Sequence, residues 1–224
     1  METFRLGKTE LQITRTGFGA LPIQRISFDD SAAILRRAYE AGITFFDTAR
    51  AYTDSEEKIG YALADVRDDI VIATKSGGTT YDAVMRDLET SLTGLRTDHV
   101  DILQLHNPAA VPDPDDPQSS YAALSAAREQ GMVRHLGITN HRLPVAREAV
   151  ASGLFETLQY PLSAISNDDD LGVIDLCRAH DVGVIAMKGM CGGILDNARL
   201  AFTFLRRYDN VVPICPNENL HPKR

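Results

Sequence analysis

The fold prediction starts from the stretch Gly42-Ile43-Thr44-Phe45-Phe46-Asp47-Thr48-Ala49-Arg50-Ala51-Tyr52, which is followed by Ser55-Glu56-Glu57-Lys58-Ile59-Gly60. The run 43–46 is apolar, β-branched or aromatic, and too short for a helix, so it predicts a strand buried on both faces. Asp47 ends this strand, and Ser55 with its acidic neighbours is typical of the start of an amphipathic helix. A carboxylate at a strand end and a tyrosine in the next loop form a candidate reactive pair. Alone, such a pair is more often a surface turn with local hydrogen bonds, so its weight depends on whether the pattern repeats.

Composition limits the classes of protein to consider. The 224 residues suit one domain, and a net charge of −8 leaves no basic footprint for nucleic acid. No apolar run approaches the ~18 residues of a membrane span, and the first residues lack the apolar core of a signal peptide. Cys177, Cys191 and Cys215 are odd in number and widely spaced. This pattern argues against disulfides or a metal site and favours a reducing cytoplasm.

A strand followed by a helix recurs along the whole chain. After a short hairpin (4–6 and 11–13), we predict strands at 16–21, 43–46, 70–75, 100–106, 133–138, 157–160, 182–187 and 210–214. Helices are predicted at 29–40, 55–66, 81–93 (stopping at Gly94), 119–129, 144–151, 168–180 and 198–207. The proline-rich segment 107–118 is predicted to be a loop that binds or covers a ligand.

This repetition predicts a parallel α/β architecture without a domain break, residues 1–224 forming one domain. A doubly wound sheet is one alternative. Eight units with polar residues at the strand ends favour a (β/α)8 TIM-type barrel with an N-terminal β-hairpin. In that fold the active site lies at the carboxyl ends of the strands.

Four strand-end residues would then converge, namely Asp47, Tyr52, Lys75 and His106. A tyrosine is a poor acid near neutrality, and a nearby ammonium favours its phenolate, so Lys75 is expected to make Tyr52 a better proton donor. Asp47 would hold Lys75, and His106 would donate a hydrogen bond to an oxygen. Such a set suits protonation of a carbonyl oxygen while a hydride, for example from a nicotinamide, attacks the carbon. Glycine-rich turns, with Gly19 in the first strand, would let a cofactor approach the backbone.

Six motifs resemble the aldo-keto reductase superfamily over nearly the full length of the chain. They are Phe46-Asp47-Thr48-Ala49 with Tyr52, then the segment 55–60, Ala73-Thr74-Lys75, the segment 101–108, Leu136-Gly137-Ile138-Thr139-Asn140 and Leu158-Gln159-Tyr160. The resemblance implies that Asp47, Tyr52, Lys75 and His106 are a catalytic tetrad with Tyr52 as the general acid. It implies that Thr139, Asn140 and Gln159 hold the nicotinamide carboxamide. It also implies that a loop with Lys188, Gly189, Gly192 and Gly193 covers the pyrophosphate of NADPH. The run Ala186-Met187-Lys188 with Gly192 and Gly193 looks closest to a branch of the family that often carries a ferredoxin-like extension, and we expect no such extension here.

The end of the sequence departs from the family pattern. Pro216 stands where a glycine is expected, Pro222 discourages a helix, and Lys223 and Arg224 do not align with the phosphate-binding positions. We therefore expect a barrel lacking the last helix and the C-terminal loop. Val211, Val212 and outward residues near Phe18 would be exposed along an open seam. We expect either a homodimer that buries the seam or a marginally stable monomer. In both cases the protein would bind NADPH with little preference over NADH.

Three functions remain open at this point. The first is a cytoplasmic NADPH-dependent reductase of small aldehydes or ketones, with NADH as the other candidate cofactor. The second is a catalytically weak barrel that senses a cofactor or binds and regulates a partner. The third, an isomerase-type barrel acting on a phosphorylated sugar, does not require the tetrad.

Overall fold

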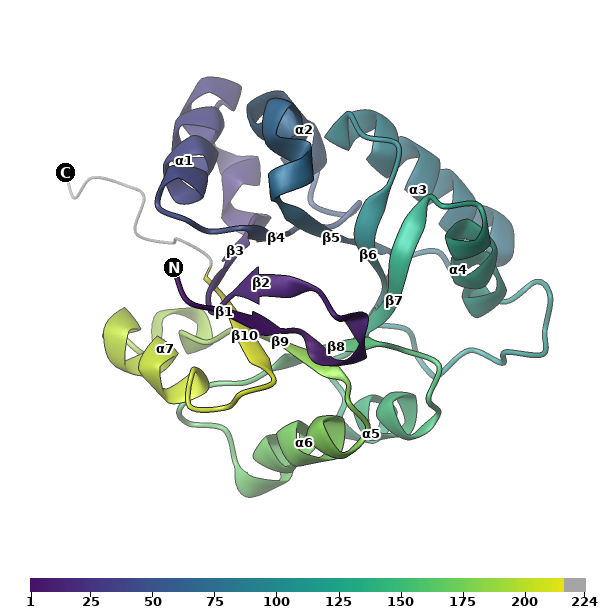
Figure 1. Ribbon diagram of the computed structural model, residues 1–224. Coiled ribbons are helices and arrows are strands. Elements are labelled where there is room, and N and C mark those ends of the chain that lie inside the picture. Colours follow the sequence, from purple (N-terminus) through teal and green to yellow (C-terminus); the bar gives the residue numbers. More distant parts are fainter. Residues whose placement is uncertain (216–224) are drawn as a thin grey trace.

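The computed structural model describes residues 1–215, and its core is a closed barrel of eight parallel strands (Figure 1). The strands follow one another around the barrel in the order β10-β3-β4-β5-β6-β7-β8-β9. Their bounds are β3 Gly17–Gly19, β4 Phe45–Asp47, β5 Val71–Ser76, β6 Val100–His106, β7 Val133–Thr139, β8 Thr157–Pro161, β9 Gly183–Met187 and β10 Val211–Cys215. The prediction of a (β/α)8 barrel is thereby confirmed.

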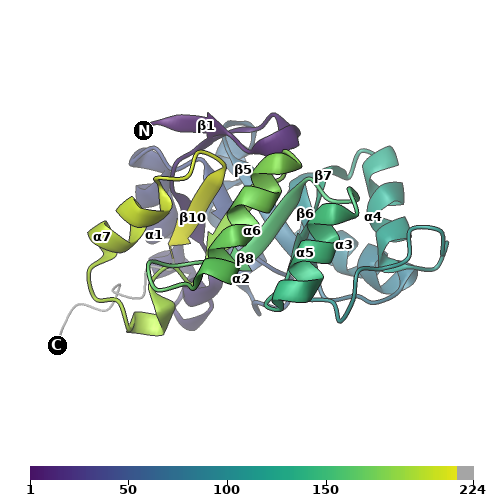
Figure 2. The same cartoon turned by 90° about the horizontal axis from the view of Figure 1, so that it is seen from below.

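Seven α-helices of the described residues surround the barrel, as the view along its axis and the side view show (Figures 1 and 2). They are α1 Phe28–Glu40, α2 Ser55–Leu63, α3 Tyr81–Leu95, α4 Ser120–Glu129, α5 Leu143–Ala151, α6 Asp168–Ala179 and α7 Ala198–Leu205. Four 3₁₀ turns complete the chain, η1 Gly7–Thr9, η2 Leu21–Arg25, η3 Ala64–Asp69 and η4 Cys191–Gly193. None of the described helices combines the length and apolarity that crossing a membrane requires.

The predicted hairpin is present and closes the amino-terminal end of the barrel (Figure 1). Its strands β1 (Thr3–Arg5) and β2 (Gln12–Thr14) are antiparallel, and Phe4, Leu6 and Ile13 pack with interior barrel residues. The fit is close, because a Cβ on Gly183 would lie 2.6 Å from the Leu6 Cγ. The hairpin thus acts as a plug, and ligands have to enter from the opposite end.

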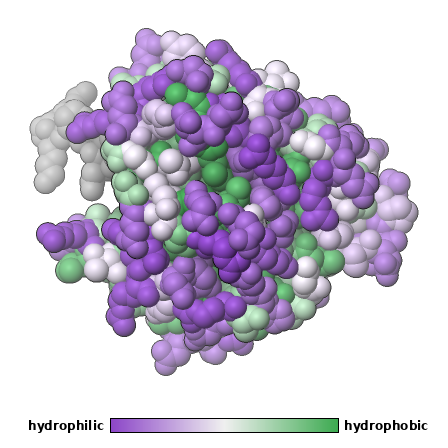
Figure 3. Space-filling view, viewed as in Figure 1, coloured by the Kyte–Doolittle hydropathy of each residue, from purple (hydrophilic) through white to green (hydrophobic). Residues whose placement is uncertain are grey.

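A second, larger core fills the space between the barrel wall and the helices. Alternation along the strands divides the two cores, since neighbouring side chains point to opposite faces. In β6, Ile102 belongs to the interior core while Leu103 and Leu105 belong to the outer one. The face that carries the hairpin is largely hydrophilic, with small hydrophobic patches between polar side chains (Figure 3).

Three predicted helix ends were wrong by two or more residues, and one of them is that of the 198–207 prediction, since α7 stops at Leu205. The α-helix of the 55–66 prediction stops at Leu63 and continues as the 3₁₀ turn η3. Helix α3 runs past Gly94 to Leu95, and Arg96 takes the left-handed cap position with φ 56°. The turn at Gly94 is where α2 approaches, because a Cβ on Gly60 would lie 2.2 Å from the Gly94 carbonyl oxygen.

The expected exposed seam is also wrong for the residues named. Val211, Val212 and Phe18 are all buried. Val212 points into the barrel with Phe45, Val211 belongs to the outer core, and the Phe18 ring lies 5.8 Å from that of Phe46. The predictions for Pro216, Pro222, Lys223 and Arg224 fall outside the described residues.

Candidate active site

The four predicted tetrad residues come from three adjacent strands at the carboxyl end of the barrel. Asp47 is the last residue of β4, Lys75 lies near the end of β5, and His106 ends β6. Tyr52 follows β4 in the loop that leads to α2. Parallel pairing keeps these strand ends level, as predicted.

Lys75 and Asp47 form a buried ion pair. The Lys75 Nζ donates to Asp47 Oδ2 at 2.7 Å and to the Thr48 carbonyl oxygen at 2.6 Å, and both charged side chains are about 1–2% exposed. Buried charges are tolerated when paired and hydrogen-bonded. The pair therefore fixes an ammonium at a defined place in the barrel mouth.

The Tyr52 ring lies close to both this ammonium and His106. The Lys75 Nζ is 5.1 Å from the Tyr52 ring centroid, and the His106 ring meets Tyr52 edge-on with centroids 5.9 Å apart. A phenol, an imidazole and an ammonium thus share one small volume, as the sequence predicted.

Burial alters the proton affinities of the two rings. Burial raises the pKa of Tyr52 above its ordinary value, while the charge of Lys75 lowers it and that of Asp47 raises it. The expected effect of Lys75 is present, but the net pKa is raised because desolvation is the larger effect. Burial and the charge of Lys75 lower the pKa of His106 to about 4, so this imidazole is neutral at pH 7.

Two glutamines complete the surroundings of Asp47. Gln104 Nε2 donates to Asp47 Oδ1 and Gln159 Nε2 donates to Asp47 Oδ2, both at 3.2 Å. Gln159 was predicted as a cofactor residue, whereas Gln104 was missed. The alternation of β6 could have revealed it, because Gln104 lies two residues from both Ile102 and His106 and so shares their inward face.

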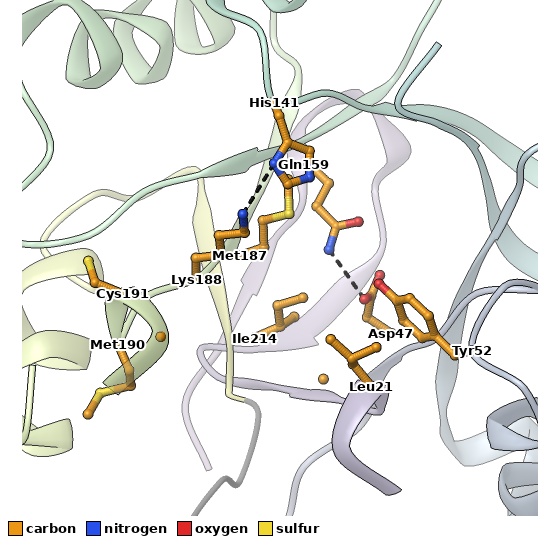
Figure 4. Close-up of a pocket in the computed structure, with 12 residues that line it drawn as sticks. Leu21, Asp47, Tyr52, His141, Gln159, Met187, Lys188, Met190, Cys191 and Ile214 are labelled. Carbon is orange, nitrogen blue, oxygen red and sulfur yellow. Dashed lines mark hydrogen bonds between the residues drawn. The ribbon is translucent and has the colours of Figure 1, made fainter. Parts of the chain in front are cut away.

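A cavity of about 500 Å³ opens beside these groups (Figure 4). Of the predicted site residues, six line it: Gly19, Asp47, Tyr52, Gln159, Lys188 and Gly192. Leu21, His141, Met187, Met190, Cys191 and Ile214 also line it and were not predicted. The other six predicted residues, Lys75, His106, Thr139, Asn140, Gly189 and Gly193, are not among its lining residues, and His106 lines a second cavity with Ser76 and Asn107.

Asn140 and Gly189 have other contacts. The Asn140 side chain donates to the Pro108 carbonyl oxygen at 2.9 Å and accepts from the Arg142 backbone N–H at 2.9 Å. It therefore ties the loop after β6 to the loop after β7. Gly189 packs on α7, since a Cβ there would lie 3.2 Å from the Leu205 Cδ1.

The loop after β9 turns sharply along one wall of the cavity. Lys188, Cys191, Gly192 and Gly193 all have positive φ, between 51° and 94°. A Cβ on Gly192 or Gly193 would meet no atom within 4 Å, so glycine is favoured there by the backbone conformation rather than by space. Lys188 Nζ lies 3.3 Å from His141 Nδ1 at the edge of the cavity (Figure 4). Burial and the charge of Lys188 lower the pKa of His141, which favours its neutral form as the partner of the ammonium.

The residues present fit a nicotinamide cofactor at one atom in particular. Gln159 lines the cavity, and its Oε1, like that of Gln104, which does not line it, is buried without a hydrogen-bond partner among residues 1–215. A buried acceptor without a donor is costly. A carboxamide N–H of a ligand would satisfy it. Within the same residues, no cluster of three or more His, Cys, Asp or Glu could hold a metal ion.

Comparison with known proteins assigns the family. The model of the aldo/keto reductase family matches residues 15–205. The chain belongs to the aldo/keto reductase family. It is 30% identical over 214 residues to the L-galactose dehydrogenase of Arabidopsis thaliana, covering 87% of this chain and 67% of that protein. It is 25% identical to the aldo-keto reductase YhdN of Bacillus subtilis, covering 87% and 64%. The chain thus spans about two thirds of the length of these curated relatives.

Solved structures agree on the fold. An aldo/keto reductase from Klebsiella pneumoniae in complex with NADP and acetate superposes with a TM-score of 0.82 at 23% identity, covering 95% of this chain and 84% of that one. At the level of the family, the chain is an NAD(P)H-dependent oxidoreductase acting on carbonyl compounds, which favours a reductase over the isomerase-type barrel.

Proposed function

We propose that this aldo/keto reductase reduces an aldehyde or ketone with NADPH and that Tyr52 is the general acid. The observation that carries the proposal is the buried Lys75–Asp47 pair beside the Tyr52 ring. Lys75 lies close enough to stabilise a developing phenolate, at 5.1 Å from the ring centroid. Asp47 holds that charge in place at 2.7 Å.

Each residue of the tetrad has a separate task in the proposed reaction. The Tyr52 hydroxyl donates its proton to the substrate oxygen as negative charge builds up there. Neutral His106 offers a ring N–H to the same oxygen and adds no second positive charge beside Lys75. Preorganised donors of this kind stabilise the charge that develops in the transition state.

We further propose that Gln159, Thr139 and Asn140 hold the carboxamide of the cofactor, with Gly19 beside them. The unpartnered Gln159 Oε1 supports this for Gln159, which would accept the carboxamide N–H. Lys188, Gly189, Gly192 and Gly193 would border the pyrophosphate. A bound reduced nicotinamide supplies the hydride, and NADH could serve in place of NADPH.

The test compares wild type with Tyr52→Phe. Calorimetric titration with NADPH and with NADH gives cofactor affinity, and the oxidation of NADPH with a panel of small aldehydes and ketones gives kcat. Tyr52→Phe should bind NADPH as wild type does and lose about 10²–10⁴-fold in kcat. Retention of more than about a tenth of kcat would show that another group is the acid. Cofactor binding without any reduction by wild type would instead favour a cofactor-sensing protein.

A further inference from the structure

Three polar side chains in the first turn of α2 are fully buried, and two of them carry charges. Ser55 is 0% exposed, and Glu56 and Lys58 are each 1% exposed. A helix between solvent and a barrel normally buries apolar side chains, and a buried charge is rarely the most stable choice. A specific positional role would explain why the chain carries charges here.

Lys58 holds the segment that follows β3. Its Nζ donates to the carbonyl oxygens of Ile23 at 3.0 Å and Ile26 at 2.7 Å, and to Asp54 Oδ1 at 2.9 Å. A lysine ammonium has three N–H donors, so all of them are used. Ile23 belongs to η2, which begins with Leu21, and Leu21 lines the cavity. Lys58 therefore fixes one wall of the cavity.

Glu56 holds the loop that carries Tyr52. Its carboxylate accepts from the Arg50 guanidinium and, at 2.6 Å, from the Thr74 hydroxyl. A second N–H of Arg50 donates to the Thr53 carbonyl oxygen at 3.1 Å. Thr53 has φ 44°, a left-handed conformation that a β-branched residue adopts only when its surroundings impose it.

The two contacts act on different loops although they start in the same turn of the helix. In Figure 4, Leu21 and Tyr52 lie on the same side of the cavity, opposite Lys188 and Cys191. Leu21 belongs to the segment held by Lys58. Tyr52 directly precedes Thr53, whose carbonyl oxygen accepts a hydrogen bond from Arg50. Burial raises the pKa of Glu56 above its ordinary value even though Thr74 and Arg50 lower it, which reflects how little water reaches this carboxylate.

We infer that the first turn of α2 positions both loops, with a different residue acting chiefly on each: Lys58 sets the cavity wall at 21–26 and contacts the second loop at Asp54, and Glu56, through Arg50, sets the loop that carries Tyr52. Both are positioning residues, since neither lines the cavity. The part of this inference that concerns kcat rests on the proposed function, whereas the part that concerns loop order and cofactor affinity does not.

The experiment measures hydrogen exchange of backbone amides, NADPH affinity and steady-state kinetics for Lys58→Met and Glu56→Gln. Glu40→Gln, at an exposed glutamate on the neighbouring helix α1 with no salt bridge among the described residues, is the control. Lys58→Met should speed exchange at 21–26, weaken NADPH binding about three- to tenfold and change kcat less than about threefold. Glu56→Gln should speed exchange at 49–54, lower kcat about ten- to a hundredfold and change NADPH affinity less than about twofold.

The pattern across variants decides the inference. Identical effects of both variants on both loops, or a lower Tm with unchanged exchange and kinetics, would show that the charges serve only stability. If Lys58→Met does not fold, Lys58→Gln, which keeps two N–H donors in place of three on a shorter side chain, should still speed the exchange at 21–26. Glu56→Asp serves in the same way for the other loop. Wild type that binds NADPH and fails to reduce any carbonyl would refute the proposed function, and the exchange maps would still decide the positional roles.

Discussion

Replacing Lys75 by methionine tests the electrostatic core of the proposed site. The substitution keeps an unbranched chain of similar length and removes the ammonium that Asp47 holds at 2.7 Å. Asp47 keeps the amide donors of Gln104 and Gln159, each at 3.2 Å. The variant therefore removes one charge while most of the packing remains.

The magnitude follows from the distance between the ammonium and the ring of Tyr52. At 5.1 Å, two unit charges in an effective dielectric constant of about 20 interact with about 3 kcal/mol. Because the pKa of Tyr52 is already raised by burial, losing this attraction makes its phenolate harder still to form. An energy of about 3 kcal/mol corresponds to a factor on the order of a hundred in rate. We expect kcat to fall about 10²–10³-fold, with a loss of stability of about 3–5 kcal/mol from the unpaired carboxylate.

The assay compares kcat, NADPH affinity and thermal unfolding for wild type, Lys75→Met, Tyr52→Phe and the double variant. Lys8→Met, on the hairpin at the other end of the barrel, is the control and should change none of these quantities appreciably. Residues that act as a unit give non-additive losses, so the double variant should be little worse than either single one. Losses that multiply in the double variant would mean that Lys75 and Tyr52 act independently, and the reasoning would be refuted.

Three further predictions concern other parts of the site and the fold. Gln159→Leu should weaken NADPH binding by about 1–3 kcal/mol, measured by calorimetry, because it removes the buried Oε1 acceptor; unchanged affinity would exclude Gln159 from the cofactor site. The pKa of His106 is lowered to about 4 in the folded chain, so between pH 6.5 and about 4 the unfolded chain binds more protons, and stability falls as the pH decreases. His106→Asn should reduce the fall in Tm over that window, and an identical fall would contradict the role of burial. Gly183→Ala should lower the free energy of unfolding, measured by urea titration, by about 1–3 kcal/mol, because the new Cβ would clash with Leu6. An unchanged free energy would mean that the hairpin shifts to make room for the methyl group.

Local sequence signals sufficed for the barrel and for the tetrad. Short buried strands ended by polar residues predict parallel pairing, and in a closed barrel those ends meet at one face. That is why the residue pattern alone could bring Asp47, Lys75 and His106 together. The same reasoning placed Tyr52 near these residues, because it follows the end of the strand by only five residues and so cannot lie far from Asp47.

Contacts between distant loops were beyond the reach of these signals. Asn140 belongs to a family motif, yet its side-chain amide donates a hydrogen bond to the Pro108 carbonyl oxygen and so connects two loops. The loop that contains Pro108 has no regular sequence pattern from which this contact could be predicted. Gly94 was interpreted as a helix end, whereas it lies inside α3 at the point where Gly60 of α2 approaches. The pKa of Tyr52 depends on how completely the fold excludes water, and a sequence shows only that a lysine is near.

Asp47 connects the proposed acid group, Lys75 with Tyr52, to the proposed cofactor residue Gln159. The sequence motifs gave no sign of this connection. Its Oδ2 accepts from both Lys75 and Gln159, so one oxygen holds the ammonium beside Tyr52 and orients the glutamine that we propose to bind the cofactor. The Gln159 side-chain amide cannot flip by 180°, because its Oε1 would then face the Asp47 carboxylate, and two oxygen acceptors repel each other. Its Nε2 is therefore committed to Asp47, and its Oε1 is left as a buried acceptor without a partner, on a residue that lines the cavity. If Gln159 holds the cofactor as proposed, the group that it meets must be a hydrogen-bond donor, as a carboxamide N–H is. The Asp47 carboxylate that positions the Lys75 ammonium also sets this requirement.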